Sequence, residues 1–243
     1  MSSEAASTPQ RTVQRGSFVL IDYVIKIKDT DELIDTTIEE EAKKAGVTDV
    51  SRIYEPRLSV VGKGFLLRAI EEGLIGMQVG DHRKFEVPPD RAFGNRDPTK
   101  VRVYPLRRFK DVDQPLRVGS KIVIEGREGI VRSIGSGRVQ IDFNHQLADK
   151  TLTCDVWVRE VLEDRESKAY HLLHDKIPEV TKENTTIEEE GGVIKIKLPK
   201  DVYLISGLQV IKRVVSKELL DSLEGVERVT FIEEYEKESS PPA

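Results

Sequence analysis

The sequence predicts an α+β protein built from an antiparallel sheet wrapped on a short helix, an inserted small all-β domain and a C-terminal α+β domain. Three observations support this prediction. A long strand pattern with a hairpin return opens the chain, a short apolar stripe at helical spacing follows it, and a new pattern of helices and strands starts at Asp164. At 243 residues the chain is long enough for two or three domains.

Composition excludes several classes of function. Charged residues make up 33% of the chain and nearly balance at a net charge of −5, which argues against a nucleic-acid partner. The single cysteine, Cys154, excludes an internal disulfide and a cysteine-rich zinc site, and it suits a reducing compartment. The N-terminal residues lack the apolar segment of a signal peptide, and the chain has no run of roughly 18 apolar residues. We therefore expect a cytoplasmic protein without a membrane partner, with a disordered leader at residues 1–15 and a polar tail at residues 237–243.

The first strand pattern covers residues 17–28, turns at residues 29–31 and returns through residues 32–37. Residues 38–51 are rich in Glu and Lys and predict a solvated helix or bulge without chemistry of its own. A further strand at residues 56–61 leads into the helix.

The helical stripe follows that strand. Its members recur at helical spacing and are Leu66, Ala69, Ile70, Gly73 and Leu74. The opposite face of the helix is expected to carry Arg68, Glu71 and Glu72. Gly76 then favours a left-handed cap, and residues 84–87 alternate like a strand that Pro88 ends.

The middle of the chain contains a second group of strands. Two glycine-bearing turns join strand patterns at residues 121–125, 130–134 and 138–143, which predicts a three-stranded antiparallel meander with a small core of its own. The closing strand at residues 153–161 is expected to point Cys154, Val156 and Val158 inward and Trp157 outward.

The last third of the chain predicts a helix, a hairpin, a second helix and a final strand. Asp164 is positioned to cap the first helix, which runs to Ile177. Tyr170 and Leu173 on that helix, together with Trp157, are expected to make an apolar contact between domains. His171 and His174 lie one helical turn apart, but no Cys or third His accompanies them, so a surface or interface role is favoured over a metal site.

Three stretches carry a resemblance to a known family. G-K-G-F-L-L-R-A-I-E-E-G-L-I-G-M-Q-V-G-D from Gly62, followed by V-P-P-D-R-A-F-G, resembles the FKBP-type peptidyl-prolyl isomerases. N-H-Q-L-A-D-K-T-L from Asn144 is similar to the segment by which SlyD-like FKBPs return from their insert-in-flap domain, with Asp149 in place of the usual glycine. The C-terminal part resembles the extra domain of long-type archaeal FKBP proteins. The resemblance implies a discontinuous isomerase domain at residues 16–96 and 142–163, an insert at residues 97–141 and a C-terminal domain at residues 164–236.

The resemblance also implies an activity and a set of site residues. The activity is cis-trans isomerisation of X–Pro bonds combined with chaperone action on unfolded chains, and no metal or cofactor is expected. The implied catalytic residues are Tyr23, Asp35, Leu67 and Phe93. The implied substrate-binding residues are Ile34, Leu66, Ile70, Leu147 and Cys154. The insert residues expected to bind clients are Tyr104, Leu106, Phe109, Val123 and Ile130. Where many relatives have tryptophan, tyrosine and phenylalanine, this sequence has Ile70, Phe93 and Cys154, so a wider and less polar pocket is expected.

Unfolded or proline-containing polypeptides are the expected partners, and a homodimer through the C-terminal domain is one expected assembly. A chain ending near Glu163 is expected to keep isomerase activity. Two alternatives stay open: a non-catalytic chaperone that only holds extended peptides, and a dimeric structural scaffold. Taken singly, Tyr23 and Asp35 could equally be an ordinary strand residue and an ordinary turn acid. Their order and distance relative to residues 61–94 favour the functional interpretation.

Overall fold

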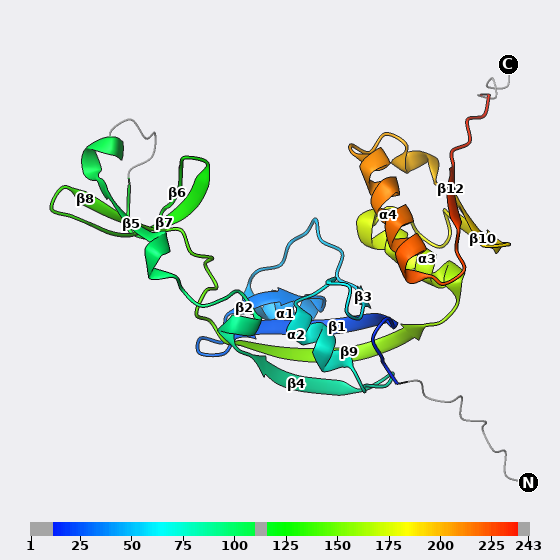
Figure 1. The fold of residues 1–243 in the computed structure, drawn as a ribbon, viewed down its shortest axis with the longest axis horizontal. Helices are drawn as coiled ribbons and strands as arrows, with labels where there is room; N and C mark the ends of the chain where they lie inside the picture. The colour runs from blue at the N-terminus through cyan, green and yellow to red at the C-terminus, as the bar shows by residue number, and fades with distance from the viewer. Residues whose placement is uncertain (1–11, 110–115, 238–243) are drawn as a thin grey trace, which may run out of the picture. The chain divides into compact units, whose positions relative to one another are not determined.

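The computed structural model describes residues 12–109 and 116–237 (Figure 1). The expected leader, except for residues 12–15, and the expected tail, except for residue 237, lie outside the described residues. The chain divides into two compact units. The described residues of the first are 12–26, 32–85 and 154–237, and those of the second are 27–31, 86–109 and 116–153.

A five-stranded sheet with two short helices forms the framework of the isomerase-like part. The elements are β1 (Phe18–Ile27), β2 (Leu33–Thr36), α1 (Glu39–Ala45), β3 (Arg57–Val60), α2 (Arg68–Leu74), β4 (His82–Val87) and β9 (Leu152–Leu162). The strand order is β2-β1-β9-β4, and β3 also pairs with β1. β1 is almost wholly buried, because most of its residues are apolar and the carboxylate of its buried Asp22 accepts hydrogen bonds from Thr37 and Arg159. β3 pairs antiparallel with its first half and β2 with its second half.

Helix α2 packs against β4 at a glycine. A Cβ atom built on Gly73 would lie 2.7 Å from the ring of Phe85, so a larger residue there would require this ring to move. The stripe residues Ala69, Ile70 and Leu74 are buried as expected. The predicted place of Glu71 is wrong: its side chain is buried, because it binds backbone N–H groups of the loop that precedes the helix. Leu66 lies in that loop and not in the helix.

The insert is a four-stranded antiparallel sheet, so the predicted three-stranded meander is one strand short. The strands are β5 (Val101–Pro105), β6 (Lys121–Ile124), β7 (Arg127–Gly135) and β8 (Arg138–Asp142), in the order β5-β8-β7-β6. Short 3-10 turns are η1 (Pro89–Arg91), η2 (Pro98–Lys100) and η3 (Leu106–Phe109). The additional strand, β5, ends in a proline, which an edge strand tolerates because one row of its N–H groups is not needed for pairing. The core of the sheet consists of Ile124, Val131, Val139 and Ile141.

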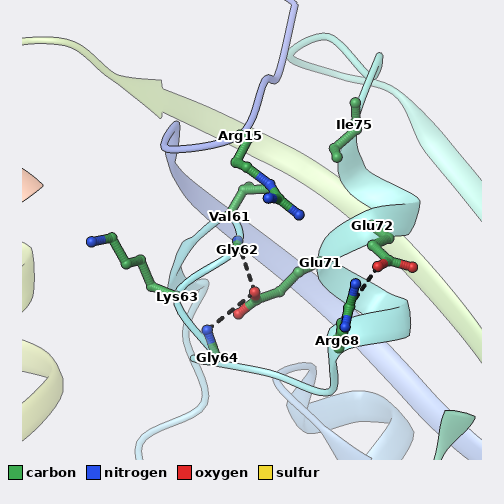
Figure 2. A pocket seen from close by; sticks show the side chains of 9 residues that line it. All are labelled: Arg15, Val61, Gly62, Lys63, Gly64, Arg68, Glu71, Glu72 and Ile75. Carbon is green, nitrogen blue, oxygen red and sulfur yellow. Dashed lines mark hydrogen bonds and ion pairs between the residues drawn. The ribbon is translucent and has the colours of Figure 1, made fainter.

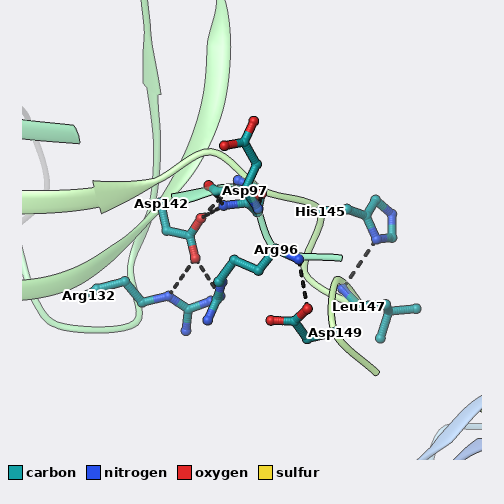
Figure 3. A network of polar contacts seen from close by, with 8 residues as sticks. Arg96, Asp97, Arg132, Asp142, His145, Leu147 and Asp149 are labelled. Carbon is teal, nitrogen blue, oxygen red and sulfur yellow. Dashed lines mark hydrogen bonds and ion pairs between the residues drawn. The ribbon is translucent and has the colours of Figure 1, made fainter. Parts of the chain in front are cut away.

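A buried carboxylate organises the base of the insert (Figure 3). Asp142 is 2% exposed and accepts hydrogen bonds from Arg96, from Arg132 Nε at 3.1 Å and from the backbone N–H of Asn144 at 2.9 Å. Although burial opposes it, hydrogen bonds from Asn144 and Arg132 hold the pKa of Asp142 below its usual range. Asp149 adopts a φ of 65°, a left-handed conformation that aspartate tolerates better than most residues, and it accepts a bond from the N–H of Arg96 at 2.7 Å.

The C-terminal part is an α+β domain, as predicted. Its elements are α3 (Arg165–Lys176), β10 (Thr186–Glu190), β11 (Val193–Lys197), η4 (Lys200–Val202), α4 (Leu208–Ser222) and β12 (Arg228–Ile232). Asp164 caps α3 by accepting from the N–H of Ser167 at 2.7 Å. Leu173 and Tyr170 belong to a core that includes residues of β1 and β3, whereas Trp157 stacks on His82 with ring centroids 4.5 Å apart.

Candidate active site

A tyrosine and an aspartate on neighbouring strands form the centre of the candidate site. The hydroxyl of Tyr23 on β1 donates to Asp35 Oδ2 on β2 at 2.7 Å. The second carboxylate oxygen of Asp35 accepts from the N–H of Thr36 at 2.9 Å. Burial, followed by the nearby carboxylate of Asp35, raises the pKa of Tyr23. The phenol therefore stays protonated and remains a hydrogen-bond donor at neutral pH.

Two arginines that the sequence analysis did not single out complete this polar group. Arg52 Nη1 donates to Asp35 Oδ1 at 2.6 Å, and Arg57 Nη1 lies 3.5 Å from the hydroxyl oxygen of Tyr23. Arg57 gave a usable signal, because it is the one charged residue of β3, a strand otherwise buried. Arg52 gave none, since it lies in an exposed polar loop.

The carboxylate of Glu71, a residue of α2, holds the loop that precedes this helix (Figure 2). Glu71 is 2% exposed, and its Oε2 accepts from the N–H groups of Gly62 and Gly64 at 2.8 and 3.2 Å. Its Oε1 accepts from the N–H of Leu66 at 3.0 Å. An open cavity of about 470 Å³ adjoins this loop. The sequence carries no local sign of this arrangement, because both glycines lie in an exposed loop and Glu71 stands beside polar residues in the helix.

The remaining candidate residues fall into both units. In the first, Ile70 and Cys154 are buried, while Ile34, Leu66 and Leu67 are partly exposed. Leu67 is the cap residue of α2, with φ −53° and ψ 132°. Burial raises the pKa of the Cys154 thiol to about 12, and the charge of Asp155 adds to the shift.

Phe93 and Leu147 lie in the second unit. The ring of Phe93 stacks on His145, with centroids 4.5 Å apart and planes at 2°. His145 Nδ1 accepts from the N–H of Leu147 at 3.2 Å. Leu147 is 8% exposed.

Residues 12–109 and 116–237 contain no group of three or more His, Cys, Asp or Glu side chains that could hold a metal ion. None of the helices in these residues is both long enough and apolar enough to cross a membrane.

Comparison with known proteins decides the family. The model for "FKBP-type peptidyl-prolyl cis-trans isomerase" matches residues 9–106. A short-type peptidyl-prolyl cis-trans isomerase of Methanocaldococcus jannaschii is 34% identical over 149 residues, which cover 61% of this chain and 94% of that protein. The chain belongs to the FKBP-type peptidyl-prolyl cis-trans isomerases.

The two other parts of this FKBP-type isomerase have family matches of their own. The model "FKBP26, IF domain" matches residues 102–147, and "FKBP26_C-terminal" matches residues 165–236. The FKBP-type 16 kDa isomerase of Escherichia coli strain K12 is 30% identical over 155 residues, 62% of this chain and 94% of that protein. SlyD of the same strain is 30% identical over 135 residues, 54% of this chain and 67% of SlyD. The predicted family, fold class and enzyme class are confirmed.

Proposed function

We propose that this FKBP-type isomerase rotates X–Pro bonds at a site formed by Tyr23, Asp35, Leu67 and Phe93, and that its insert holds extended segments of unfolded clients. The observation that carries the site is the 2.7 Å hydrogen bond from Tyr23 to Asp35. If Tyr23 and Asp35 had separate structural roles, there would be no reason for the buried phenol to donate to a carboxylate on the neighbouring strand.

The proposed mechanism needs no acid, base or nucleophile. The barrier to rotation about an X–Pro bond is ~18–20 kcal/mol and comes mostly from amide resonance. A planar amide is charge-separated and well solvated, whereas the twisted amide is less polar. An apolar site that holds the twisted form and excludes water therefore stabilises the transition state relative to the ground state.

Each proposed residue has one role in this mechanism. The partly exposed Ile34 and Leu66 contact the substrate, and the buried Ile70, Leu147 and Cys154 give the site its apolar shape from below the surface. The Tyr23–Asp35 pair orients the rotating carbonyl, the backbone N–H of Leu67 binds the substrate chain, and Phe93 contributes an apolar wall. Arg52 and Arg57 keep Asp35 and Tyr23 in place through the contacts described above.

The wall role of Phe93 has a matched control. Phe93→Ala removes the proposed wall, and its expected result is a loss of about tenfold or more in kcat/KM for a proline tetrapeptide. Its stacking partner His145 can be removed by His145→Ala while the Phe93 ring stays. Equal losses in both variants would show that only the local stacking matters and would contradict the wall role.

The insert offers apolar groups that its own core does not use. Tyr104 and Phe109 pack against that core, and Ile130 is partly buried, so these three have little surface to offer. Val123 and Leu106 are 71% and 40% exposed. Val103 and Val118 are also exposed and were not singled out from the sequence.

Two of these exposed residues share one face of the insert sheet. Val123 neighbours the buried Ile124 on β6, and Val103 neighbours Tyr104, which pairs with the buried Val139. Because side chains alternate along a strand, Val103 and Val123 lie on the face opposite the core. Their strands, β5 and β6, are the two edges of the sheet. An edge strand with apolar neighbours can pair with an extended client, which supports the proposed client binding.

Replacing residues 97–141 by a short loop tests the division of labour. Tetrapeptide turnover should stay within about tenfold of the wild type, because the free peptide needs only the site. Catalysed refolding of a proline-limited protein should be nearly abolished, because a tethered client raises the local concentration of its prolines. Equal loss of both activities would show that the insert only supports the site.

We also propose that the C-terminal domain mediates homodimer formation. Its exposed apolar residues include Leu204 and Val210, which are 96% and 66% exposed. Light scattering of the wild type and of Val210→Glu tests this assembly. A wild type that is monomeric at high concentration would contradict it.

A further inference from the structure

One short pair of strands has two faces with different surroundings. In the antiparallel pairing of β1 and β3, Phe18 lies opposite Val60 and Leu20 opposite Leu58. Paired residues share a face of the sheet. All four are at most 8% exposed, and all four belong to the same apolar core as the buried side chains of α3 and α4. The C-terminal domain therefore covers this face.

The other face of the same strand pair belongs to the candidate site. Ile21 lies opposite Arg57 in the register, so Arg57 is on the face away from the shared core. Its guanidinium reaches the hydroxyl of Tyr23 at 3.5 Å. The polypeptide that carries Arg57 is thus packed on the C-terminal domain and contacts the proposed catalytic tyrosine.

Helix α3 contacts the isomerase-like part at several points along its length. Lys168 Nζ lies 5.3 Å from the ring centre of Phe18. His174 Nε2 is 2.7 Å from Glu55 Oε1, and Asp175 Oδ1 is 3.8 Å from Arg57 Nε. The contacts of His174 and Asp175 hold the segment from Glu55 to Arg57 against α3.

The last contact of α3 reaches the loop before α2. Lys176 Nζ lies 5.3 Å from the ring centre of Phe65, and Phe65 packs against the shared core. Phe65 directly precedes Leu66 and Leu67, the residues proposed to bind the substrate. Helix α3 therefore contacts both the segment that carries Arg57 and the loop that leads to Leu67.

We propose that helix α3 positions the isomerase site, through Asp175 acting on Arg57 and through the core beneath Phe65. This inference rests on the proposed site residues. It gives the C-terminal domain a role in turnover of even the smallest substrate, and Asp175 is a positioning residue that does not itself touch substrate. It also opposes the expectation that a chain ending near Glu163 keeps full activity, because such a chain would uncover Phe18, Leu20, Leu58 and Val60.

The test uses the full chain and a double-mutant cycle. Asp175→Asn keeps the shape of the side chain and removes its charge, and its expected effect is a three- to tenfold lower kcat/KM for a proline tetrapeptide at an unchanged unfolding midpoint. In an Arg57→Met background the same change should have no further effect. Asp175→Glu should restore part of the activity. Asp201→Asn, at an exposed aspartate of the same domain, is the control and should change nothing.

A second readout does not depend on catalysis. The ring signals of Tyr23 in NMR spectra, assigned with Tyr23→Phe, should shift in Asp175→Asn and stay in place in Asp201→Asn. If the wild type is active, the positioning role is overturned when the effects of Asp175→Asn and Arg57→Met are additive, or when the Tyr23 signals do not move. If the wild type is inactive but the Tyr23 signals still respond to Asp175→Asn, the proposed site is overturned and the coupling between α3 and Tyr23 stands.

Discussion

The carboxylate of Glu71 accepts a hydrogen bond from the backbone N–H of Leu66 at 3.0 Å. The same side chain binds Gly62 and Gly64, so one buried acid fixes the whole loop that leads to Leu67. A charged group this deeply buried is retained only when its oxygens are satisfied, and here backbone donors satisfy them.

Glu71→Gln should disturb this loop while the volume of the side chain stays nearly the same. One carboxylate oxygen becomes an amide group that donates, so at least one loop N–H faces a donor. We expect a loss of about 1–3 kcal/mol in the free energy of unfolding and a fall in kcat/KM of about tenfold. Urea unfolding and a tetrapeptide assay measure the two effects.

Glu72→Gln is the matched control, since Glu72 is the next residue of the same helix and pairs with the exposed Arg68. Its effect should stay within about 0.5 kcal/mol. Similar effects of the two substitutions would contradict the role given to Glu71.

Leu67→Pro should remove the substrate-binding N–H and leave the fold intact. Leu67 has a φ of −53° and is the cap of α2, outside the helix, so a proline ring fits its backbone. We expect circular dichroism like that of the wild type together with a loss of about tenfold or more in kcat/KM. A Leu67→Pro variant that is folded and fully active would show that catalysis does not need this N–H.

The sequence predicts the apolar parts of this site better than its polar parts. The stripe from Ala69 to Leu74 and the closing strand follow from periodicity, and the structure has both. Periodicity predicts the wrong face for Glu71, because it reports the polarity of a side chain and not the N–H groups that a buried acid can bind. Arg52 contacts Asp35 from 17 residues away in the chain, a relationship that no local pattern contains.

Cys154 should resist alkylation in the folded protein. Burial raises its pKa to about 12, and its side chain is fully buried, so at pH 8 both the thiolate fraction and access are low. A thiol reagent should react slowly in buffer and rapidly after unfolding in urea. Fast reaction of the native protein would contradict the buried position of this residue.

Acid should weaken the base of the insert through Asp142. The folded-state pKa of Asp142 lies below its unfolded value of about 3.9. Its contribution to stability is therefore fully present above that value and is lost as pH falls through the folded pKa. Asp142→Asn should cost about 1–3 kcal/mol at pH 7 and flatten the dependence of stability on pH below about 4.

The control for Asp142 is Asp90→Asn, at an exposed aspartate of the same unit. It should leave both the stability at pH 7 and its acid dependence as in the wild type. If Asp142→Asn and Asp90→Asn give the same acid profile, the network at Asp142 does not set the stability of the insert's base.

One strand of the insert cannot be predicted from its own residues. Glycine-bearing turns predict the other three strands of the insert, whereas β5 gives no usable signal, because its five residues lie in a basic segment and end in proline. Its pairing partner β8 lies more than thirty residues away, so the strand is recognisable only once the sheet is formed.

The rate of cis-trans isomerisation of a proline tetrapeptide, compared for the wild type, Tyr23→Phe and Asp35→Ala, shows whether the Tyr23–Asp35 pair takes part in catalysis. We expect a wild-type rate well above the spontaneous one. We also expect losses of about tenfold or more in both variants while the fold persists, because each variant removes one end of the Tyr23–Asp35 hydrogen bond. A wild-type rate equal to the spontaneous one, or variants as active as the wild type, would contradict this catalytic role and favour a protein that only holds its clients.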